Sequence, residues 1–153
     1  MRLLLDTTYL LPAVGLGVEG LPGDLVVRLI GRGHEVVISY ITVFELAAKG
    51  AKYVAQGKLT VERVLKGLKA VLHDDRIERV LAHEQEVLFT AVNLRRLLPD
   101  FVNCLILATA LHKADVLVTE DEELHEISET SEFRALAATV NPRFKVKRAR
   151  DLP

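Results

Sequence analysis

The stretch RLLLDTT, residues 2–8, decides the fold of this protein. Three consecutive leucines form an apolar run, and Asp6 follows them directly. A short run that is apolar on both faces fits a strand covered by helices on each side, as in a parallel sheet. Ligands of open α/β sheets collect beyond the carboxyl ends of the strands, so Asp6 is a candidate metal ligand. Its alternative role is to cap the next helix, because Asp6, Thr7 or Thr8 can accept hydrogen bonds from free N–H groups.

Further segments of the same kind follow along the chain. Strands are predicted at Arg2–Leu5, Glu35–Ser39, Ile77–Leu81, Asp115–Thr119 and Ala137–Asn141. Helical patterns alternate with them, at Asp24–Ile30, Thr42–Gln56, Val61–Leu72, Glu84–Leu97, Phe101–Lys113 and Glu122–Leu136. This alternation predicts a layered α/β domain with right-handed crossovers. No linker or repeat divides the chain, so we expect residues 1–153 to form one domain.

Glu45 follows the second predicted strand and stands among apolar neighbours such as Phe44 and Leu46. An unpaired buried carboxylate is prohibitively costly, so Glu45 needs a partner, and a metal ion is one. The alternative is local, because Thr42 and Glu45 have the spacing of a capping box. The residues themselves leave both roles open.

Two polar residues share a face of the predicted helix 101–113. Asp100 and Asn103 are three residues apart, and a helix places such residues on one side. Asn103 is the only strongly polar side chain between Phe101 and Ala108, and a buried amide must be hydrogen-bonded or coordinated. Asp100 is also placed to cap that helix after Pro99.

Asp121 lies just past the fourth predicted strand, as Asp6 lies just past the first. Its alternative roles are again local: Asp121 can cap the next helix, or Thr119 and Glu122 can form a capping box. Asp6, Glu45 and Asp121 all follow apolar strands closely, so a parallel sheet brings them to one edge. Their oxygens suit Mg²⁺ or Mn²⁺, and carboxylates so close would repel one another without a cation.

The charge balance carries no global signal for nucleic acid, because 20 Lys and Arg face 21 Asp and Glu. The charge is uneven, however: residues 120–132 hold seven acids and no Lys or Arg, while residues 141–153 hold five bases against one acid. The basic tail either contacts RNA phosphates or an acidic partner segment, or is simply solvated. One cysteine excludes an internal disulfide, and no signal peptide or membrane-spanning run is recognisable, so we expect a cytoplasmic protein.

Together these segments resemble the PIN-domain family, and specifically VapC-type toxin ribonucleases. The matching motifs are LLLDTTYLL (3–11), ISYITVFEL (38–46), NCLILATAL (103–111) and ADVLVTED (114–121). The resemblance implies a three-layer sandwich with a five-stranded parallel sheet between helices. It also implies Mg²⁺ or Mn²⁺ at the carboxylate cluster, and RNA cleavage.

Carried over to this chain, the resemblance implies metal ligands at Asp6, Glu45 and Asp121. Asn103 falls where the family usually has Asp. Its amide oxygen can still coordinate but has no formal charge, so we expect weaker metal binding. Asp100, one turn back, can supply the missing carboxylate. The expected catalytic residues are therefore Asp6, Glu45, Asp121, Asn103 and Asp100.

The function that the resemblance implies is a metal-dependent endoribonuclease, the toxin of a toxin–antitoxin pair. Two alternatives stay open: a catalytically weakened PIN-like module that binds RNA or protein, and an RNA-processing nuclease. The expected partners are an RNA substrate, a small antitoxin protein and a second copy in a homodimer, with no membrane. Lys49 or Lys52, which follow Glu45, either contact substrate phosphates or are plain surface lysines.

Overall fold

The computed structural model describes residues 1–153. Five strands form one sheet: β1 (Arg2–Leu5), β2 (Glu35–Ser39), β3 (Ile77–Val80), β4 (Val116–Val118) and β5 (Lys145–Lys147). The α-helices are α1 (Leu25–Gly31), α2 (Tyr40–Ala55), α3 (Val61–His73), α4 (Gln85–Leu94), α5 (Phe101–Lys113), α6 (Glu122–Ser128) and α7 (Ser131–Val140). Two 3₁₀ helices, η1 (Thr7–Val14) and η2 (Ala149–Asp151), complete the chain.

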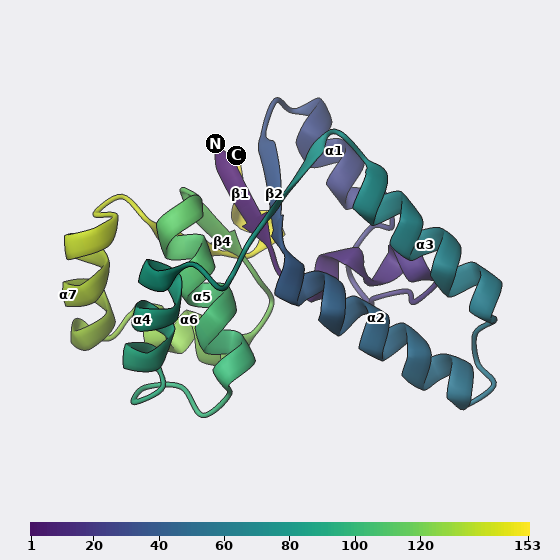
Figure 1. Cartoon of the computed structure of the whole chain (residues 1–153). Helices are drawn as coiled ribbons and strands as arrows, with labels where there is room; N and C mark the ends of the chain where they lie inside the picture. Colours follow the sequence, from purple (N-terminus) through teal and green to yellow (C-terminus); the bar gives the residue numbers. More distant parts are fainter.

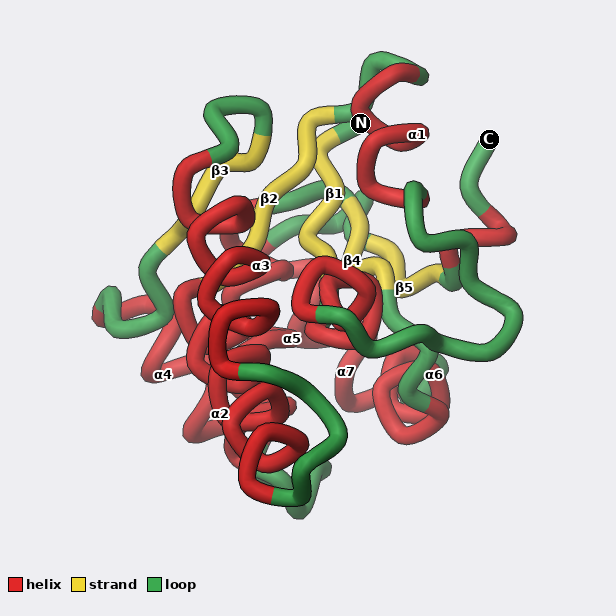
Figure 2. The backbone as a smooth tube through the Cα atoms, turned by 90° about the vertical axis from the view of Figure 1, so that its right-hand side faces the viewer, coloured by secondary structure: helices red, strands yellow, loops and turns green.

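The strands lie in the order β3-β2-β1-β4-β5, and every neighbouring pair is parallel (Figure 2). β1 is the central strand of the sheet. Its leucines are fully buried, as expected of a strand that is covered on both faces. Leu4 pairs with Val37 of β2, and Leu5 pairs with Val118 of β4. All carboxyl ends therefore meet at one edge of the sheet. The predicted five-stranded parallel α/β fold is confirmed.

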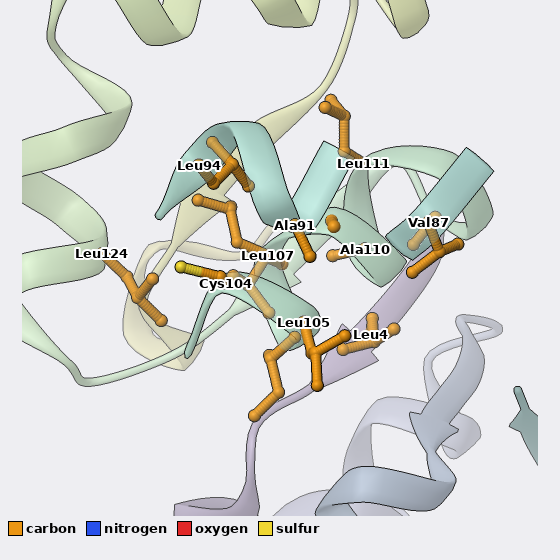
Figure 3. Packing of buried hydrophobic residues seen from close by; sticks show 14 of the residues in the cluster. Leu4, Val87, Ala91, Leu94, Cys104, Leu105, Leu107, Ala110, Leu111 and Leu124 are labelled. Carbon is orange, nitrogen blue, oxygen red and sulfur yellow. The ribbon is translucent and has the colours of Figure 1, made fainter. Parts of the chain in front are cut away.

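Helices cover both faces of this sheet (Figure 1). Successive residues of a strand point to opposite faces. Leu4 therefore packs in a cluster with α4, α5, α6 and α7, while Leu3 and Leu5 pack in a second cluster with α1, α2, α3 and η1. Figure 3 shows Leu4 with the α4 and α5 side chains of the first cluster. The result is a three-layer sandwich.

α5 is the most deeply buried helix. Every residue from Cys104 to Leu111 is buried, as expected of a helix that is apolar all round. Cys104 packs there as a free, buried thiol. This burial holds the start of α5, with Asp100 and Asn103, against the carboxyl edge of the sheet. None of the helices combines the length and hydropathy needed to span a membrane.

Three predicted elements are wrong. The segment Ala137–Asn141 is not a strand but the end of α7, and the fifth strand is β5 at Lys145–Lys147. A short apolar run suits either structure, and packing of Ala137 in the helical layer decided between them. The predicted helix Glu122–Leu136 is two helices: α6 ends at Ser128, and Thr130 caps α7 by accepting from the Phe133 N–H at 3.3 Å. The segment Leu11–Gly23 has four Gly and two Pro, which predicts a loop, but its first residues belong to η1.

Candidate active site

A polar cavity of about 340 Å³ lies at the carboxyl edge of the sheet, and no hydrophobic residue lines it. Five acids line it, together with one lysine, two threonines and one asparagine: Asp6, Glu45, Asp100, Glu120, Asp121, Lys49, Thr7, Thr8 and Asn103. The structure thus brings all five predicted site residues to one place. A larger cavity of about 430 Å³ between α7 and β5 contains none of them.

Asp6 lies at the centre of this arrangement and is only 8% exposed. Its Oδ1 accepts from the Thr7 N–H at 2.7 Å, so Asp6 caps η1 as the alternative prediction has it. Its Oδ2 accepts from the Thr119 hydroxyl at 2.7 Å. The same hydroxyl accepts from the Asp121 N–H at 3.1 Å, which ties the ends of β1 and β4 together. Capping and lining the cavity are therefore compatible roles for Asp6.

Glu45 faces the cavity from α2, and its Oε1 accepts from the Thr7 hydroxyl at 2.6 Å. The predicted capping box of Thr42 and Glu45 is wrong. α2 begins at Tyr40 and is capped by Ser39, which accepts from the Ile41 N–H at 3.2 Å. Thr42 consequently lies inside the helix with its hydroxyl buried and unpaired. Glu45 is left free to turn toward the sheet edge.

Asp100 and Asn103 reach the cavity from the start of α5. Asp100 caps this helix, since its Oδ1 accepts from the Val102 N–H at 2.8 Å. The Asn103 amide donates to Asp121 Oδ2 at 3.5 Å. Asp121 caps α6 by accepting from the Leu124 N–H at 3.1 Å. The alternative capping box is wrong because the cap is Asp121 and not Thr119.

The comparisons with known proteins agree with this architecture. A family model for the PIN domain matches residues 3–130.

The chain belongs to the PIN domain family. Among solved structures it is similar to a chain of the crystal structure of VapBC2 from Rickettsia felis bound to a DNA fragment from their promoter. The TM-score is 0.62 at 18% identity, over 96% of this chain and 98% of that chain. This likeness concerns the fold. A search of curated proteins found no match.

Burial and neighbouring charges both affect the pKa values of the carboxylates in this PIN domain. Burial raises the pKa of Asp6, and the negative charge of Asp121 raises it further. Burial likewise raises the pKa of Glu45, with Asp6 adding to the effect. Lys49 opposes both shifts. A bound cation would relieve the same cost that a proton relieves, so metal and proton compete at this site.

The residues present fit a hard divalent cation. All donors are oxygens of carboxylate, amide and hydroxyl groups, as Mg²⁺ and Mn²⁺ prefer. No three Asp, Glu, His or Cys side chains converge into a ready-made cage. Such a cage is not required, because Mg²⁺ keeps several waters and is usually held by one or two carboxylates.

Lys49 and Lys52 were both candidates for contacting substrate phosphates. Lys49 lines the cavity, and Lys52 does not. Glu120 was missed as a site residue. It appears in the sequence only as one member of the acidic run, although it directly precedes Asp121 at the end of a strand. That position is the signal that could have identified it.

The Thr119 hydroxyl is expected to stabilise the fold by joining Asp6 and Asp121. Thr119→Val keeps the shape but leaves a buried carboxylate oxygen and a backbone N–H without their partner. The free energy of unfolding should fall by about 1–3 kcal/mol, measured by urea denaturation. Thr139→Val, at an exposed position of α7, is the matched control and should change it by less than about 0.5 kcal/mol. Equal losses in both variants would contradict this role.

Proposed function

We propose that this PIN domain is a metal-dependent endoribonuclease that hydrolyses phosphodiester bonds, and that it acts as the toxin of a toxin–antitoxin pair. PIN domains are generally nucleases. The observation that carries the proposal is the polar cavity, where five carboxylates and no hydrophobic residue line one edge of a buried sheet. A site of this charge repels a phosphodiester unless a cation offsets it, which is why we propose Mg²⁺ or Mn²⁺.

The proposed ligands are Asp6, Glu45, Asp121 and the amide oxygen of Asn103, with Asp100 beside them. When bound, the divalent cation supplies Lewis-acid chemistry: it polarises a phosphoryl oxygen and lowers the pKa of a coordinated water. Glu45 faces the cavity from α2, and its carboxylate would accept the proton of the attacking water. The water oxygen would bond to phosphorus as the ester P–O bond breaks, and the leaving oxygen would take up a proton from solvent.

Lys49 is the one cation in the cavity lining. It lies four residues after Glu45 on α2, so both side chains share a face of that helix. We propose that it contacts a phosphate of the substrate backbone, a contact that positions RNA without reading its sequence.

The test is cleavage of single-stranded RNA by the purified chain, free of any inhibitor. We expect cleavage with Mg²⁺ or Mn²⁺, none with EDTA, and none of a DNA strand of the same sequence. If RNA is bound but not cut with either metal, the alternative of a PIN-like binding module is correct. A small adjacent reading frame for an antitoxin would separate the toxin from an RNA-processing nuclease.

One observation favours the binding-module alternative, and it is the uncharged Asn103. Asn103→Asp adds a carboxylate to the cavity and is expected to tighten Mn²⁺ binding by about tenfold, as ligand charge tunes cation affinity. Titration of Mn²⁺ measures this directly, without substrate. Asn93→Asp adds the same charge at an exposed site on α4 and should leave the affinity unchanged. Equal affinities for wild type and Asn103→Asp would mean that position 103 does not contact the metal.

We also propose two protein partners, a small antitoxin and a second copy of the chain. Support comes from large apolar side chains that the isolated chain leaves in water. Phe44 on α2 is 70% exposed, and Phe89 and Val92 on α4 are 65% and 64% exposed. Phe89 and Val92 are three residues apart and share one face of α4, and an apolar face of this kind is suited to contact another protein. Light scattering gives the mass of the chain alone, and co-expression with the adjacent reading frame tests the antitoxin.

A further inference from the structure

Glu120 is a cavity residue that contacts parts of the chain far away in sequence. The Tyr9 hydroxyl donates to Glu120 Oε1 at 2.7 Å. The Nε of Arg148 lies 3.6 Å from Glu120 Oε2. One partner belongs to η1 and the other to the segment that joins β5 to η2, so both ends of the chain contact this carboxylate.

Tyr9 is suited to hold Glu120 in one position. The ring is only 4% exposed, and its hydroxyl also accepts from the Ala149 N–H at 3.2 Å. Burial and the neighbouring carboxylate keep the pKa of Tyr9 well above its usual range, so the hydroxyl stays a neutral donor. The Tyr9 hydroxyl can therefore donate to Glu120 throughout the neutral pH range.

Arg148 fixes Glu120 from the other side. Its guanidinium also donates to Glu122 Oε1 at 2.5 Å, so one side chain joins the C-terminal segment to α6. Arg148 is 21% exposed and Glu120 is 32% exposed. A free glutamate samples many rotamers, and two partners from opposite elements remove most of that freedom.

We propose that Glu120 is a further carboxylate of the active site, and that Tyr9 and Arg148 are its positioning residues. This inference rests on the proposed function. A carboxylate has about four acceptor positions, and the Tyr9 hydroxyl and the Arg148 guanidinium use at most two of them, so Glu120 keeps lone pairs for a metal ion or its water.

The test is Mn²⁺ titration and RNA cleavage by Glu120→Gln, which removes the charge and keeps the shape. We expect Mn²⁺ affinity to fall by about tenfold, a factor typical of a lost group around a metal, and kcat/KM to fall with it. Glu123→Gln removes an equal charge from an exposed position on α6 outside the cavity and should leave both values unchanged. Wild-type affinity in Glu120→Gln overturns the inference.

Tyr9→Phe tests the positioning role separately. Loss of the hydroxyl should lower the Mn²⁺ affinity, as Glu120→Gln does. The double variant Tyr9→Phe/Glu120→Gln should bind Mn²⁺ no more weakly than Glu120→Gln alone. A lower melting temperature with unchanged Mn²⁺ affinity would show that Tyr9 only supports the fold, and would overturn its positioning role. Asp6→Asn separates the two levels. If Asp6→Asn also binds Mn²⁺ as the wild type does, the proposed metal site fails. If Glu120→Gln binds Mn²⁺ as the wild type does and Asp6→Asn does not, only the inference about Glu120 fails.

Discussion

Asp6→Asn is expected to reduce metal-dependent RNA cleavage by on the order of 10²–10³-fold or more, the loss seen when one well-placed charged or polar group is removed from a catalytic site. Asp6 is the most buried carboxylate of the cavity and is held by Thr7 and Thr119 from two directions. No other cavity residue can take its place at the end of the central strand. Steady-state cleavage of a single-stranded RNA with Mn²⁺ measures the effect.

The same substitution is expected to change the stability of the metal-free protein little at pH 7, because two effects oppose each other. The pKa of Asp6 is higher in the folded than in the unfolded chain, so its ionisation at neutral pH costs stability. This cost disappears as the pH falls through the folded-state pKa, and a neutral Asn never incurs it. Against this gain, the amide gives up one of the two acceptor oxygens that Thr7 and Thr119 use, which costs about 1–3 kcal/mol. In EDTA the variant should therefore melt close to the wild type at pH 7, and its melting temperature should fall relative to that of the wild type as the pH falls.

The effect of Mn²⁺ on the melting temperature is the complementary control for Asp6→Asn. A ligand that binds only the folded state raises the melting temperature, so Mn²⁺ should stabilise the wild type and hardly affect the variant. A variant that melts well below the wild type in EDTA would contradict this account. Its loss of cleavage would then reflect unfolding and not the missing ligand.

Gly67→Ala is expected to produce the largest loss of stability of any single methyl addition in this chain. A Cβ at Gly67 would lie 2.1 Å from the Ala13 carbonyl oxygen and 2.7 Å from its carbon. Both contacts are with backbone, so α3 and η1 must move apart. We expect the free energy of unfolding to fall by about 3 kcal/mol or more, measured by urea denaturation. Because η1 begins directly after Asp6, cleavage should fall as well.

Gly31→Ala is the matched control for this prediction. Gly31 also lies in a helix, and nothing is within 4 Å of the Cβ that Ala would add there. Alanine has the higher helix propensity, so Gly31→Ala should be neutral or stabilise the fold by up to about 1 kcal/mol. Similar changes in both variants would mean that the close approach of α3 and η1 is not what requires glycine at position 67.

Strands with an unambiguous pattern were predictable with their bounds. β1 and β2 run over the residues predicted for them, because continuous apolar segments bounded by polar residues leave few other solutions. β5 was missed because a short edge strand of Lys, Val and Lys has little apolar content. The segment Ala137–Asn141 was mistaken for it because its apolar residues face the neighbouring helix layer, which local sequence does not reveal.

The residues of the candidate site also differ in whether local sequence or tertiary packing reveals them. Asp6 and Asp121 were predictable because Asp6 directly follows an apolar strand and Asp121 lies within three residues of the end of another. Glu45 was ambiguous, since the choice between a capping box and the cavity depended on where α2 begins. Glu120 was not predictable as a site residue, because the contacts that hold it come from Tyr9 and Arg148.

The sequence by itself determined the parallel sheet, its central strand and the edge at which acids gather, because apolar periodicity and the position of a residue after a strand are local properties. Only the tertiary structure decided which acids share one cavity and what holds each of them. The physical reason is that burial, charge repulsion and hydrogen bonding act between groups that are close in space. Thr119 and Asp6 are separated by more than a hundred residues, and their side chains nevertheless lie 2.7 Å apart.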